Sequence, residues 1–341
     1  MITIRLARFD EIPLIMEFVE SNWKHGHILG TDRRFFDWMF TEGEKVNVVI
    51  AIDEENERLY GIEGVIVYNH EDKPDVSGVM WKVIKSDDPF LGIEILDFIK
   101  KSMGVRYSVG IGLNKKAGKI FQLYSGKENS IARMDRFYRL GKRESFSVAD
   151  IRNPRSQEYV KAESYFRELE DIREFMNAIP DSELRKYVPY KDYEYIRHRY
   201  FDHDIYTYRI FQLVVDGIGR EAAFVFRKVE VNDTCVLKHI DYFGESNLIA
   251  YAGMAIDSLI EQYDAEYADL YSYGIDGSLV RSAGFIQASE DDENIIPNYF
   301  EPFERVNVDI WVSDILYDGV SIRIFRGDGD MDRPSSRQTV I

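Results

Sequence analysis

The chain has 341 residues, which is enough for about two domains. Its 60 acidic residues outnumber its 43 basic ones, so the net charge is −17 and the surface disfavours nucleic acid and anionic membranes as partners. Hydrophobic residues make up 45% of the chain, which excludes wholesale disorder. No apolar run is long enough to span a bilayer and the N-terminus has no signal-peptide pattern, so we expect a cytoplasmic protein.

The first half of the chain alternates between strand-like and helix-like hydrophobic patterns. The patterns predict the order β-α-α-β-β-β-α-β-α-β. The predicted strands are 2–7, 46–53, 60–68, 77–84, 107–113 and 133–140, and the predicted helices are 10–19, 33–40, 92–101 and 115–124.

The second half repeats this order and ends in an irregular tail from Ile324 onward. The predicted strands are 145–150, 206–215, 222–231, 236–243, 268–273 and 306–312, and the predicted helices are 157–176, 190–200, 247–262 and 277–283. The repetition predicts a duplicated α/β unit with mixed sheets. We expect an N-terminal domain over 1–143 and a C-terminal domain over 144–341, the second copy being degenerate.

Few residues could hold a metal or act as a reactive thiol. Cys235 is the single cysteine, and its strand-like surroundings are typical of a buried, inert thiol. The pair His25 and His27 is a weak metal signal, and the acidic run from Asp328 to Asp332 lacks the remaining ligands of a calcium loop. We therefore expect no metal site.

The predicted order resembles the GCN5-related N-acetyltransferase (GNAT) fold of acyl-CoA N-acyltransferases, present twice. In the first half, three segments carry the resemblance: the opening strand and helix, the strand that runs through a turn into the helix at Gly92, and the strand that ends at Asn114 before a helix. In the second half, the run from Ser282 to Phe285 resembles the short helix and Gly-Phe pair that close a GNAT unit.

More narrowly, the whole chain resembles two-domain GNAT enzymes that acylate nucleotide-linked amino sugars for surface polysaccharides such as O-antigen. The closest resemblance is to those acting on dTDP-3-amino-3,6-dideoxyhexoses with acetyl or 3-hydroxybutyryl donors. The matching segments are 22–32, 296–303 and 327–334. The resemblance implies acyl-CoA as donor and a nucleotide-linked amino sugar as acceptor, with no nucleic-acid or membrane partner, and it leaves a homodimer open.

The resemblance also implies where acyl-CoA binds. Backbone N–H groups over 82–84 would polarise the thioester carbonyl, and those at the start of the next helix would hold the pyrophosphate. The sequence departs from the family's Arg/Gln-x-x-Gly-x-Gly/Ala loop, because Asp87 and Asp88 stand in it and only Gly92 matches. The residues expected to bind acyl-CoA are Trp81, Lys82, Val83, Ile84, Leu91, Gly92 and Asn114.

Two side chains are candidates for proton transfer. His27 lies in the loop where GNAT acceptor sites form, and an imidazole suits a base that works near neutral pH. Phe121 occupies the position of the family's acidic tyrosine, so the candidate acid is Tyr124, three residues later on the same helix face. The alternatives are deprotonation through water, and core packing for both aromatic residues.

Four residues are candidates for binding the acceptor: His25, Asp32, Asp332 and Arg333. The guanidinium group of Arg333 suits a phosphate or a pair of sugar hydroxyls. Two simpler interpretations remain, namely that Asp32 caps the helix 33–40 and that the tail is a solvated acidic segment.

These inferences predict an N-acyltransferase whose first unit binds acyl-CoA and whose second unit shapes the acceptor site. One alternative is a Fem-type aminoacyl transferase, although the charge of −17 disfavours its aminoacyl-tRNA substrate. The other is a non-catalytic module that binds a carbohydrate or nucleotide, which the altered phosphate loop and Phe121 favour.

Overall fold

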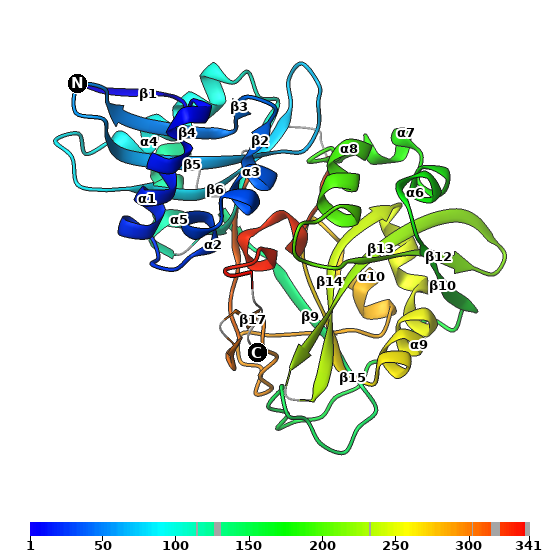
Figure 1. Ribbon diagram of the computed structural model, residues 1–341. Coiled ribbons are helices and arrows are strands. Elements are labelled where there is room, and N and C mark those ends of the chain that lie inside the picture. The colour runs from blue at the N-terminus through cyan, green and yellow to red at the C-terminus, as the bar shows by residue number, and fades with distance from the viewer. Residues whose placement is uncertain (114, 126–130, 232, 302, 315–320, 338–341) are drawn as a thin grey trace. The chain divides into compact units, whose positions relative to one another are not determined.

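The computed structural model describes residues 1–113, 115–125, 131–231, 233–301, 303–314 and 321–337. The chain forms two compact units (Figure 1). Of the described residues, unit 1 contains those within Met1–Ala132, Trp311–Tyr317 and Arg333–Thr339, and unit 2 contains those within Arg133–Ile310 and Asp318–Asp332. The first boundary thus lies before the predicted join at 143, and two late segments return to unit 1.

Unit 1 is built on a seven-stranded mixed sheet. Its strand order is β1 (Ile2–Leu6), β4 (Val48–Asp53), β5 (Arg58–Val67), β6 (Asp75–Val83), β7 (Tyr107–Leu113), β19 (Trp311–Asp314) and β8 (Ile131–Arg133). A short hairpin, β2 (Thr41–Glu42) and β3 (Lys45–Val46), precedes β4. β4 is rich in β-branched residues and almost wholly buried, as a strand covered on both faces requires.

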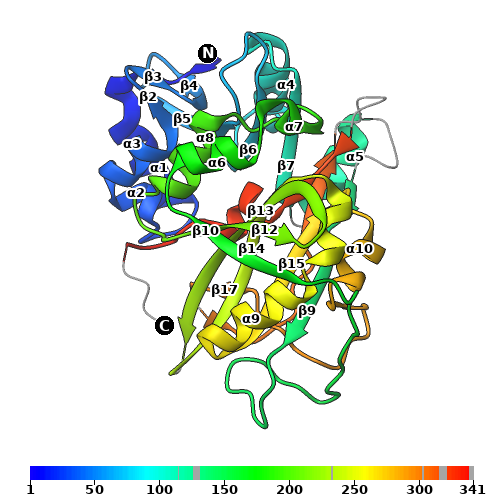
Figure 2. The same ribbon diagram turned by 90° about the vertical axis from the view of Figure 1, so that its right-hand side faces the viewer.

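Helices cover both faces of this sheet (Figure 2). A Cβ atom on Gly64 would lie 2.5 Å from Phe40 of α3, whereas one on Gly61 would lie 2.7 Å from Ile95 of α4, so the two glycines face opposite helices. In α4, Leu91, Ile95 and Ile99 repeat every four residues and form the buried stripe. The helices of unit 1 are α1 (Ile12–Asn22), α2 (Ile28–Thr31), α3 (Arg33–Phe40), α4 (Leu91–Ser102) and α5 (Lys115–Ser125), with a 3₁₀ turn η1 (Phe9–Glu11).

Unit 2 is built on an eight-stranded mixed sheet. Its order is β10 (Ser164–Leu169), β12 (Arg209–Val215), β13 (Ile218–Val231), β14 (Thr234–Gly244), β15 (Ala265–Tyr273), β9 (Asp135–Leu140) and β16 (Ile286–Gln287), and β21 (Ile324–Phe325) also pairs with β15. Two small pairs lie outside it: β11 (Tyr187–Val188) with β20 (Ser321–Ile322), and β17 (Tyr299–Phe300) with β18 (Phe303–Glu304).

The helical segments of unit 2 are short except for α9 (Gly253–Tyr263). The prediction of a helix over 157–176 is wrong, because β10 pairs with β12 and only α6 is helical. The segment 145–150 forms no strand beyond one bridge from Asp150 to Ile295. The remaining segments are α6 (Ile172–Ala178), α7 (Asp181–Leu184), α8 (Tyr193–Ile196), the π-helix η2 (Arg197–Phe201), η3 (Ser246–Tyr251), α10 (Gly277–Ser282), η4 (Arg326–Asp328) and η5 (Asp330–Asp332).

The two units exchange strands along the sequence. The segment 133–140, expected to close the first sheet, forms β9, which pairs with β15 and β16 in the second sheet. In return β19, from the late part of the chain, pairs with β7 in the first sheet. The first sheet is therefore completed by a strand that is remote from it in sequence, whereas β9 is the first strand of the continuous stretch 133–310 that forms most of unit 2.

The described residues also bear on the cysteine, metal and membrane expectations. Cys235 is buried, and burial raises the pKa of its thiol. No group of three or more metal-ligating side chains occurs within the described ranges. In that same part of the chain, no helix combines the length and the hydrophobicity that crossing a bilayer requires.

Candidate active site

In unit 1 the neighbouring parallel strands β6 and β7 diverge part-way along. Their register runs from Asp75 opposite Tyr107 to Gly78 opposite Gly110 and stops there. β6 nevertheless continues to Val83 and β7 to Leu113. We call these diverging strand ends the first splay. Its inner edges carry backbone groups that the two strands do not use on each other.

A β-bulge in β6 lies just beyond the point of divergence. β5 pairs Gly64 with Val79 and Ile62 with Lys82, so two residues of β6, Met80 and Trp81, stand opposite one residue of β5. Met80 has a φ of 61°, which is uncommon for a side chain of its size. Bulges of this kind re-aim backbone groups and are frequent beside active sites.

The bulge determines which N–H group is directed into the splay. The N–H of Ile84 donates to the carbonyl of Tyr60 in β5 at 2.8 Å. Hydrogen bonding alternates along a strand, so Val83, one residue earlier, directs its N–H away from β5 and into the splay. Of the three residues 82–84 that the sequence offered as carbonyl donors, the geometry therefore favours Val83.

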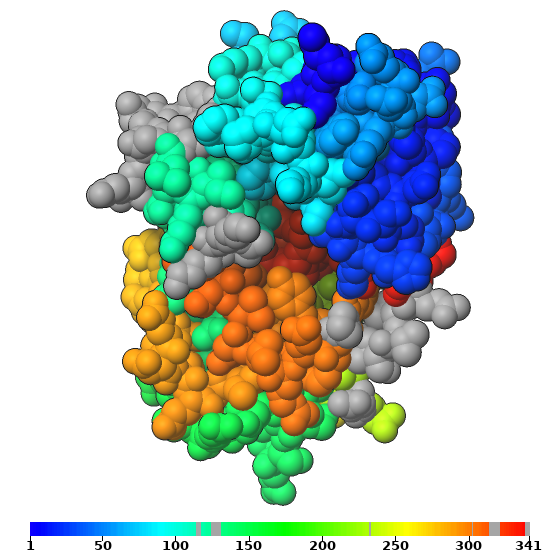
Figure 3. All heavy atoms as spheres, turned by 90° about the vertical axis from the view of Figure 1, so that its left-hand side faces the viewer, coloured from blue at the N-terminus to red at the C-terminus, as the bar shows by residue number. Residues whose placement is uncertain are grey.

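The start of α4 is the candidate phosphate site, and the cyan part of the chain, to which α4 belongs, is exposed on the face shown in Figure 3. Gly92 packs on the indole of Trp81, because a Cβ atom there would lie 2.9 Å from Cζ2. The carboxylate of Asp88 accepts the N–H of Phe90 at 2.8 Å. Burial, and then the nearby charge of Asp88, raise the pKa of Glu94. Two carboxyl groups thus accompany N–H groups that would otherwise attract an anion.

The candidate acid in α5 is only partly described. The ring of Phe121 is buried and lies 5.9 Å from that of Trp81, edge to face, so hydrocarbon fills the position expected for a tyrosine hydroxyl. Tyr124 lies within α5, but only its backbone is described, and Asn114 lies outside the described residues.

The two candidate histidines differ in environment. His27 caps α2, where its Nδ1 accepts the N–H of Leu29 at 3.2 Å, and its ring stacks on Trp23 at 5.1 Å. Burial lowers the pKa of His27 to about 4, and the charge of Lys24 acts in the same direction. His27 is therefore neutral at neutral pH but a weaker base than an ordinary imidazole. His25 is exposed, and its Nδ1 lies 2.7 Å from Glu20.

Asp32 and the last described residues are joined within unit 1. Asp32 caps α3 by accepting the N–H of Phe35 at 2.9 Å, and it pairs with Arg337. The hydrogen bond from Arg337 is the largest influence that lowers the pKa of Asp32. The carbonyl of Ser335 accepts the N–H of Ile28 at 2.9 Å. The half-buried Arg333 belongs to this same tail segment.

Sequence reasoning missed Glu63, a buried carboxyl group at the closed end of the first splay. It is 3% exposed, and a Cβ atom on Gly78 would lie 2.0 Å from its Oε1. Its Oε2 has no hydrogen-bond partner within the described residues. Burial raises the pKa of Glu63 to about 8, against the opposing charge of Lys100. The sequence signal was a single acid inside an apolar strand with a glycine two residues before it and another one residue after it.

Unit 2 repeats the diverging strands. β14 and β15 are parallel from Cys235 opposite Ala265 to His239 opposite Leu270, yet β14 continues to Gly244 and β15 to Tyr273. A bulge falls at Ile240, because Phe226 and Val225 of β13 pair with the residues on either side of it. We call these diverging strand ends the second splay.

The protein's own chain occupies the second splay. β21 pairs with β15, placing Phe325 opposite Ser272. η4 then packs against β14, where a Cβ atom on Gly327 would lie 2.9 Å from Ile240 Cγ2. Arg323 donates to the carbonyl of Gly244 at 2.6 Å, at the end of β14. We call residues 321–332 the C-terminal segment.

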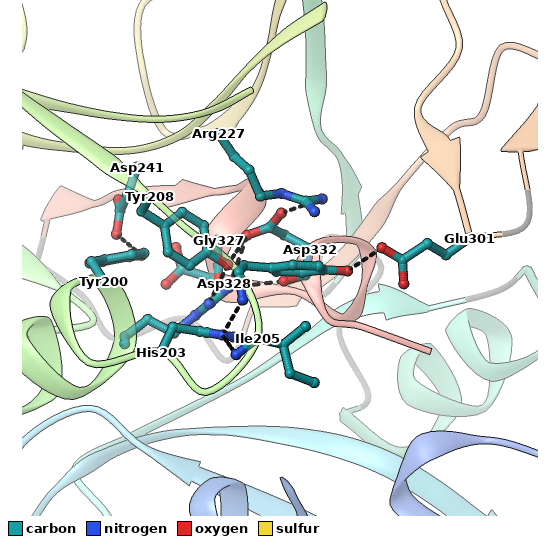
Figure 4. Close-up of polar contacts among 12 residues, drawn as sticks. Tyr200, His203, Ile205, Tyr208, Arg227, Asp241, Glu301, Gly327, Asp328 and Asp332 are labelled. Carbon is teal, nitrogen blue, oxygen red and sulfur yellow. Dashed lines mark hydrogen bonds and ion pairs between the residues drawn. The ribbon is translucent and has the colours of Figure 1, made fainter. Parts of the chain in front are cut away.

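Buried ion pairs hold the C-terminal segment in place (Figure 4). Lys191 Nζ lies 2.5 Å from Asp241 and 2.7 Å from Asp328. Asp332 is fully buried, with Arg199 and Arg227 each 3.0 Å from its carboxylate. Burial would raise the pKa of Asp332, but the charges of these two arginines hold it below its usual value. Asp332, expected to bind substrate, thus makes its charge contacts within the protein.

Comparison with known proteins supports the fold and goes no further. No family model and no curated protein matches the sequence. A GCN5-related N-acetyltransferase from Anabaena variabilis matches with a TM-score of 0.51 at 7% identity, over 92% of this chain and 72% of that one. One from Sphaerobacter thermophilus gives 0.43 at 7% identity, over 93% and 96%. Saccharomyces cerevisiae N-myristoyltransferase with bound myristoyl-CoA gives 0.42 at 12% identity, over 100% and 85%.

The chain therefore has a mixed α/β fold of the GCN5-related N-acetyltransferase type, as the sequence predicted. The diverging parallel strands with an adjacent bulge occur in both sheets, which makes the fold a tandem one. The second copy is degenerate in a definite sense: a segment of the same chain occupies its splay.

Proposed function

We propose that the protein is an acyl-CoA-dependent N-acyltransferase that uses the first splay. The observation that carries the proposal is the combination, within unit 1, of diverging strands, a bulge and an N–H group of Val83 directed between them. A preorganised backbone donor stabilises the oxyanion that forms when an amine attacks a thioester. The helix that follows supplies N–H groups for a pyrophosphate.

The remaining roles follow from the neighbouring residues. Trp81 and Gly92 form the wall between the bulge and α4, against which a pantetheine chain would pack. Lys82, half-exposed on β6, is a cation on the strand that leads to the turn with Asp88. His27 is neutral at neutral pH and its Nδ1 accepts the N–H of Leu29, so its Nε2 carries the proton and donates a hydrogen bond, and water relays the amine proton. Thiolate release proceeds without a side-chain acid at position 121.

The acceptor we propose is a nucleotide-linked amino-dideoxy sugar, specifically a dTDP-3-amino-3,6-dideoxyhexose, in surface polysaccharide synthesis. Its support is the sequence resemblance over 22–32 and 327–334. In unit 1, residues 335–337 lie against α2 and α3, beside His27 and Asp32. His25 and Arg333 are the further contacts proposed for the sugar or its phosphates.

The test is release of the CoA thiol. The protein is incubated with acetyl-CoA or 3-hydroxybutyryl-CoA and a panel of dTDP-amino sugars, and new thiol is followed with a chromogenic disulfide. The protein's single cysteine is buried, so its background is small. Acceptor-dependent thiol release with a matching acylated sugar by mass spectrometry is expected. Absence of release with every donor and acceptor overturns the proposal.

One observation favours a second candidate, a non-catalytic module that binds a carbohydrate or nucleotide. Asp88 caps the turn before α4 and Glu94 lies in the first turn, so negative charge stands where the pyrophosphate would bind. Calorimetry with CoA separates the two candidates. Saturable 1:1 binding supports the enzyme, and no binding together with binding of a dTDP-sugar selects the module.

A further inference from the structure

Unit 2 contains a cavity of about 960 Å³ outside the second splay. Its walls are the end of β9, the long loop from β9 to β10 (Figure 1), the side of α9, and the residues Gly284 and Ile286. The described residues that line it include no member of the ion pairs that hold the C-terminal segment. A cavity of this size is within the range of sites that bury small organic molecules.

Tyr159 fixes the wall that the loop supplies. Its ring packs on two glycines, because a Cβ atom on Gly253 would lie 2.5 Å from the ring and one on Gly284 would lie 3.2 Å from it. The guanidinium carbon of Arg139 lies over the same ring, 4.6 Å from its centre. These contacts preform the wall, as is usual for small-molecule sites.

Apolar side chains form much of the cavity surface. Ile286 is buried, whereas Leu140 and Phe146 are partly buried and pack against the same core cluster. Met254, on α9, keeps 37% of its surface exposed. A ligand with an aliphatic or aromatic body would remove this apolar surface from water, which favours binding.

Basic side chains are enriched around these apolar walls. Five of the nineteen lining residues are basic, compared with 43 of 341 in the whole chain. Three are acidic, so the lining carries a net charge of five minus three, or +2, in a chain whose net charge is −17. The basic residues are Arg139, Lys142, Arg143, Arg155 and Lys161, and the acidic ones are Glu158, Glu163 and Asp257.

Most carboxylates that pair with these basic groups do not line the cavity. Arg139 and Asp257 pair with each other and both line it, so this pair adds no net charge. The other paired cations of the lining contact carboxylates outside it, namely those of Glu261, Asp264, Glu266 and Asp292. Lys161 is exposed, and its ammonium group has no ion-pair partner within the described residues. The cavity therefore presents cations to a ligand.

We propose that this cavity is a second ligand site, which binds an organic acid whose apolar body carries one carboxylate or sulfonate group. The apolar walls hold the body, and Lys161 and the partly exposed Arg155 supply charged hydrogen-bond donors for the acidic group. A single acidic group matches a lining of +2 better than a polyphosphate does. The site does not depend on the proposed function of the first splay.

The test uses two fluorescent probes that differ only in an acidic group, anilinonaphthalene sulfonate and phenylnaphthylamine. Each is titrated into the full chain in excess CoA, which keeps the probes out of the first splay. One saturable site is expected, with the sulfonate bound about 10-fold more tightly or better, the value of one charged hydrogen bond. Lys161→Gln should lower the affinity for the sulfonate about 5-fold and leave that for the amine unchanged.

Two further variants locate the probe. Met254→Trp narrows the cavity and should lower the affinity for both probes. Lys73→Gln removes an exposed lysine of unit 1, and this matched control should leave both affinities unchanged. If Met254→Trp does not fold by circular dichroism, Lys161→Glu replaces it and must weaken sulfonate binding further than Lys161→Gln does.

Three results would overturn the second ligand site. They are no saturable binding of the sulfonate, equal affinity for the two probes, and sulfonate binding that the variants of Lys161 leave unchanged. None of them bears on thiol release from acyl-CoA, so the failure of this site and the failure of the proposed function are distinguishable.

Discussion

The two splays have the same topology, but a segment of the chain fills only the second one. In each, parallel strands diverge next to a bulge and leave inner backbone edges that need partners. In the second splay, β21 and η4 supply those partners from within the chain. Among the described residues, no strand pairs with β6 between Gly78 and Val83 on the β7 side of the first splay. A duplicated unit can therefore lose a ligand site by placing its own backbone where the ligand would bind.

The two splays also differ in whether their buried charged groups have partners. The second splay is closed by buried, paired ions, Lys191 with Asp241 and Asp328, and Asp332 with two arginines. The first has one buried carboxyl group, Glu63, whose Oε2 lacks a hydrogen-bond partner among the described residues. Paired buried ions specify one arrangement of the chain, whereas a polar group without a partner is suited to a partner from solution.

The largest expected effect comes from removing the ion pairs that hold the C-terminal segment in the second splay. Asp332→Asn leaves Arg199 and Arg227 buried without their counter-charge, which costs about 3–5 kcal/mol in the free energy of unfolding. Urea denaturation of the full chain measures this loss. Asp330→Asn, an exposed position in the same 3₁₀ turn, is the control. Equal stability of the Asp332 variant and the wild type would contradict the structural role of the ion pairs.

The next effect tests the inner edge of the first splay. Val83→Pro removes the N–H directed into the splay without breaking a hydrogen bond to β5. Loss of one such donor lowers kcat about 100-fold. Val83→Ala keeps the N–H and should retain most of the activity. If the two variants are equally active in the thiol-release assay, another group polarises the carbonyl.

A pH effect on stability separates Glu63 from the paired acids of the second splay. The folded state raises the pKa of Glu63 from its usual 4.5 to about 8, so the folded protein binds the proton more tightly than the unfolded chain. This contribution to stability is complete below pH 4.5 and is lost as the pH rises toward 8. Glu63→Gln removes the titration, and at pH 8 it should gain about 2 kcal/mol or more relative to pH 5.

Urea denaturation of wild type and variant at several pH values checks this difference. Glu44→Gln, at an exposed carboxyl group of unit 1, is the matched control and should follow the wild type. Parallel stability profiles for Glu63→Gln and the wild type would show that Glu63 is ionised in the folded protein.

The smallest effect concerns the end of the tail in unit 1. Arg337→Ala removes a partly exposed ion pair with Asp32, which costs less than about 1 kcal/mol. Arg337 lowers the pKa of Asp32, so the loss is fully present above the usual value of 3.8 and shrinks as the pH falls through the lowered pKa. Thermal unfolding at pH 7 and pH 3 measures the loss of stability and its dependence on pH. Arg337→Lys should restore part of the loss. A deficit that is as large at pH 3 as at pH 7 would point to packing instead of charge.

The sequence predicted the elements that depend on local pattern. Seven elements of unit 1 lie within a few residues of their predicted places, because hydrophobic periodicity follows burial on one face or both: β1, β4, β5, β6, β7, α4 and α5. The helix over 157–176 was wrong, since the six residues of β10 do not alternate polar with apolar side chains, so the strand does not stand out beside neighbouring helical patterns. Asp32 was foreseen as a helix cap because capping is a local interaction.

The sequence could not predict strand pairings and side-chain contacts between residues that lie far apart along the chain. Nothing in 133–140 indicates pairing with β15, and nothing in the tail indicates that it enters the second splay. Glu63 lies beside Gly78 only once β5 and β6 are paired, and Asp332 meets Arg199 and Arg227 only in the folded unit. The assignments of Tyr124, Asn114 and Arg333 remain predictions.

The exchanged strands constrain the order in which the molecule can be made. The first sheet lacks β19 until the ribosome has passed residue 314, and α2 lacks its bond to Ser335 until later still. During most of synthesis the outer edge of β7 is therefore an unpaired strand edge, which is a site for wrong pairing. Contacts of such sequence separation slow folding. A gene fragment ending at the predicted join would encode the first sheet without β19. The first copy of the duplicated unit therefore cannot be produced with a complete sheet by cutting the gene at that join.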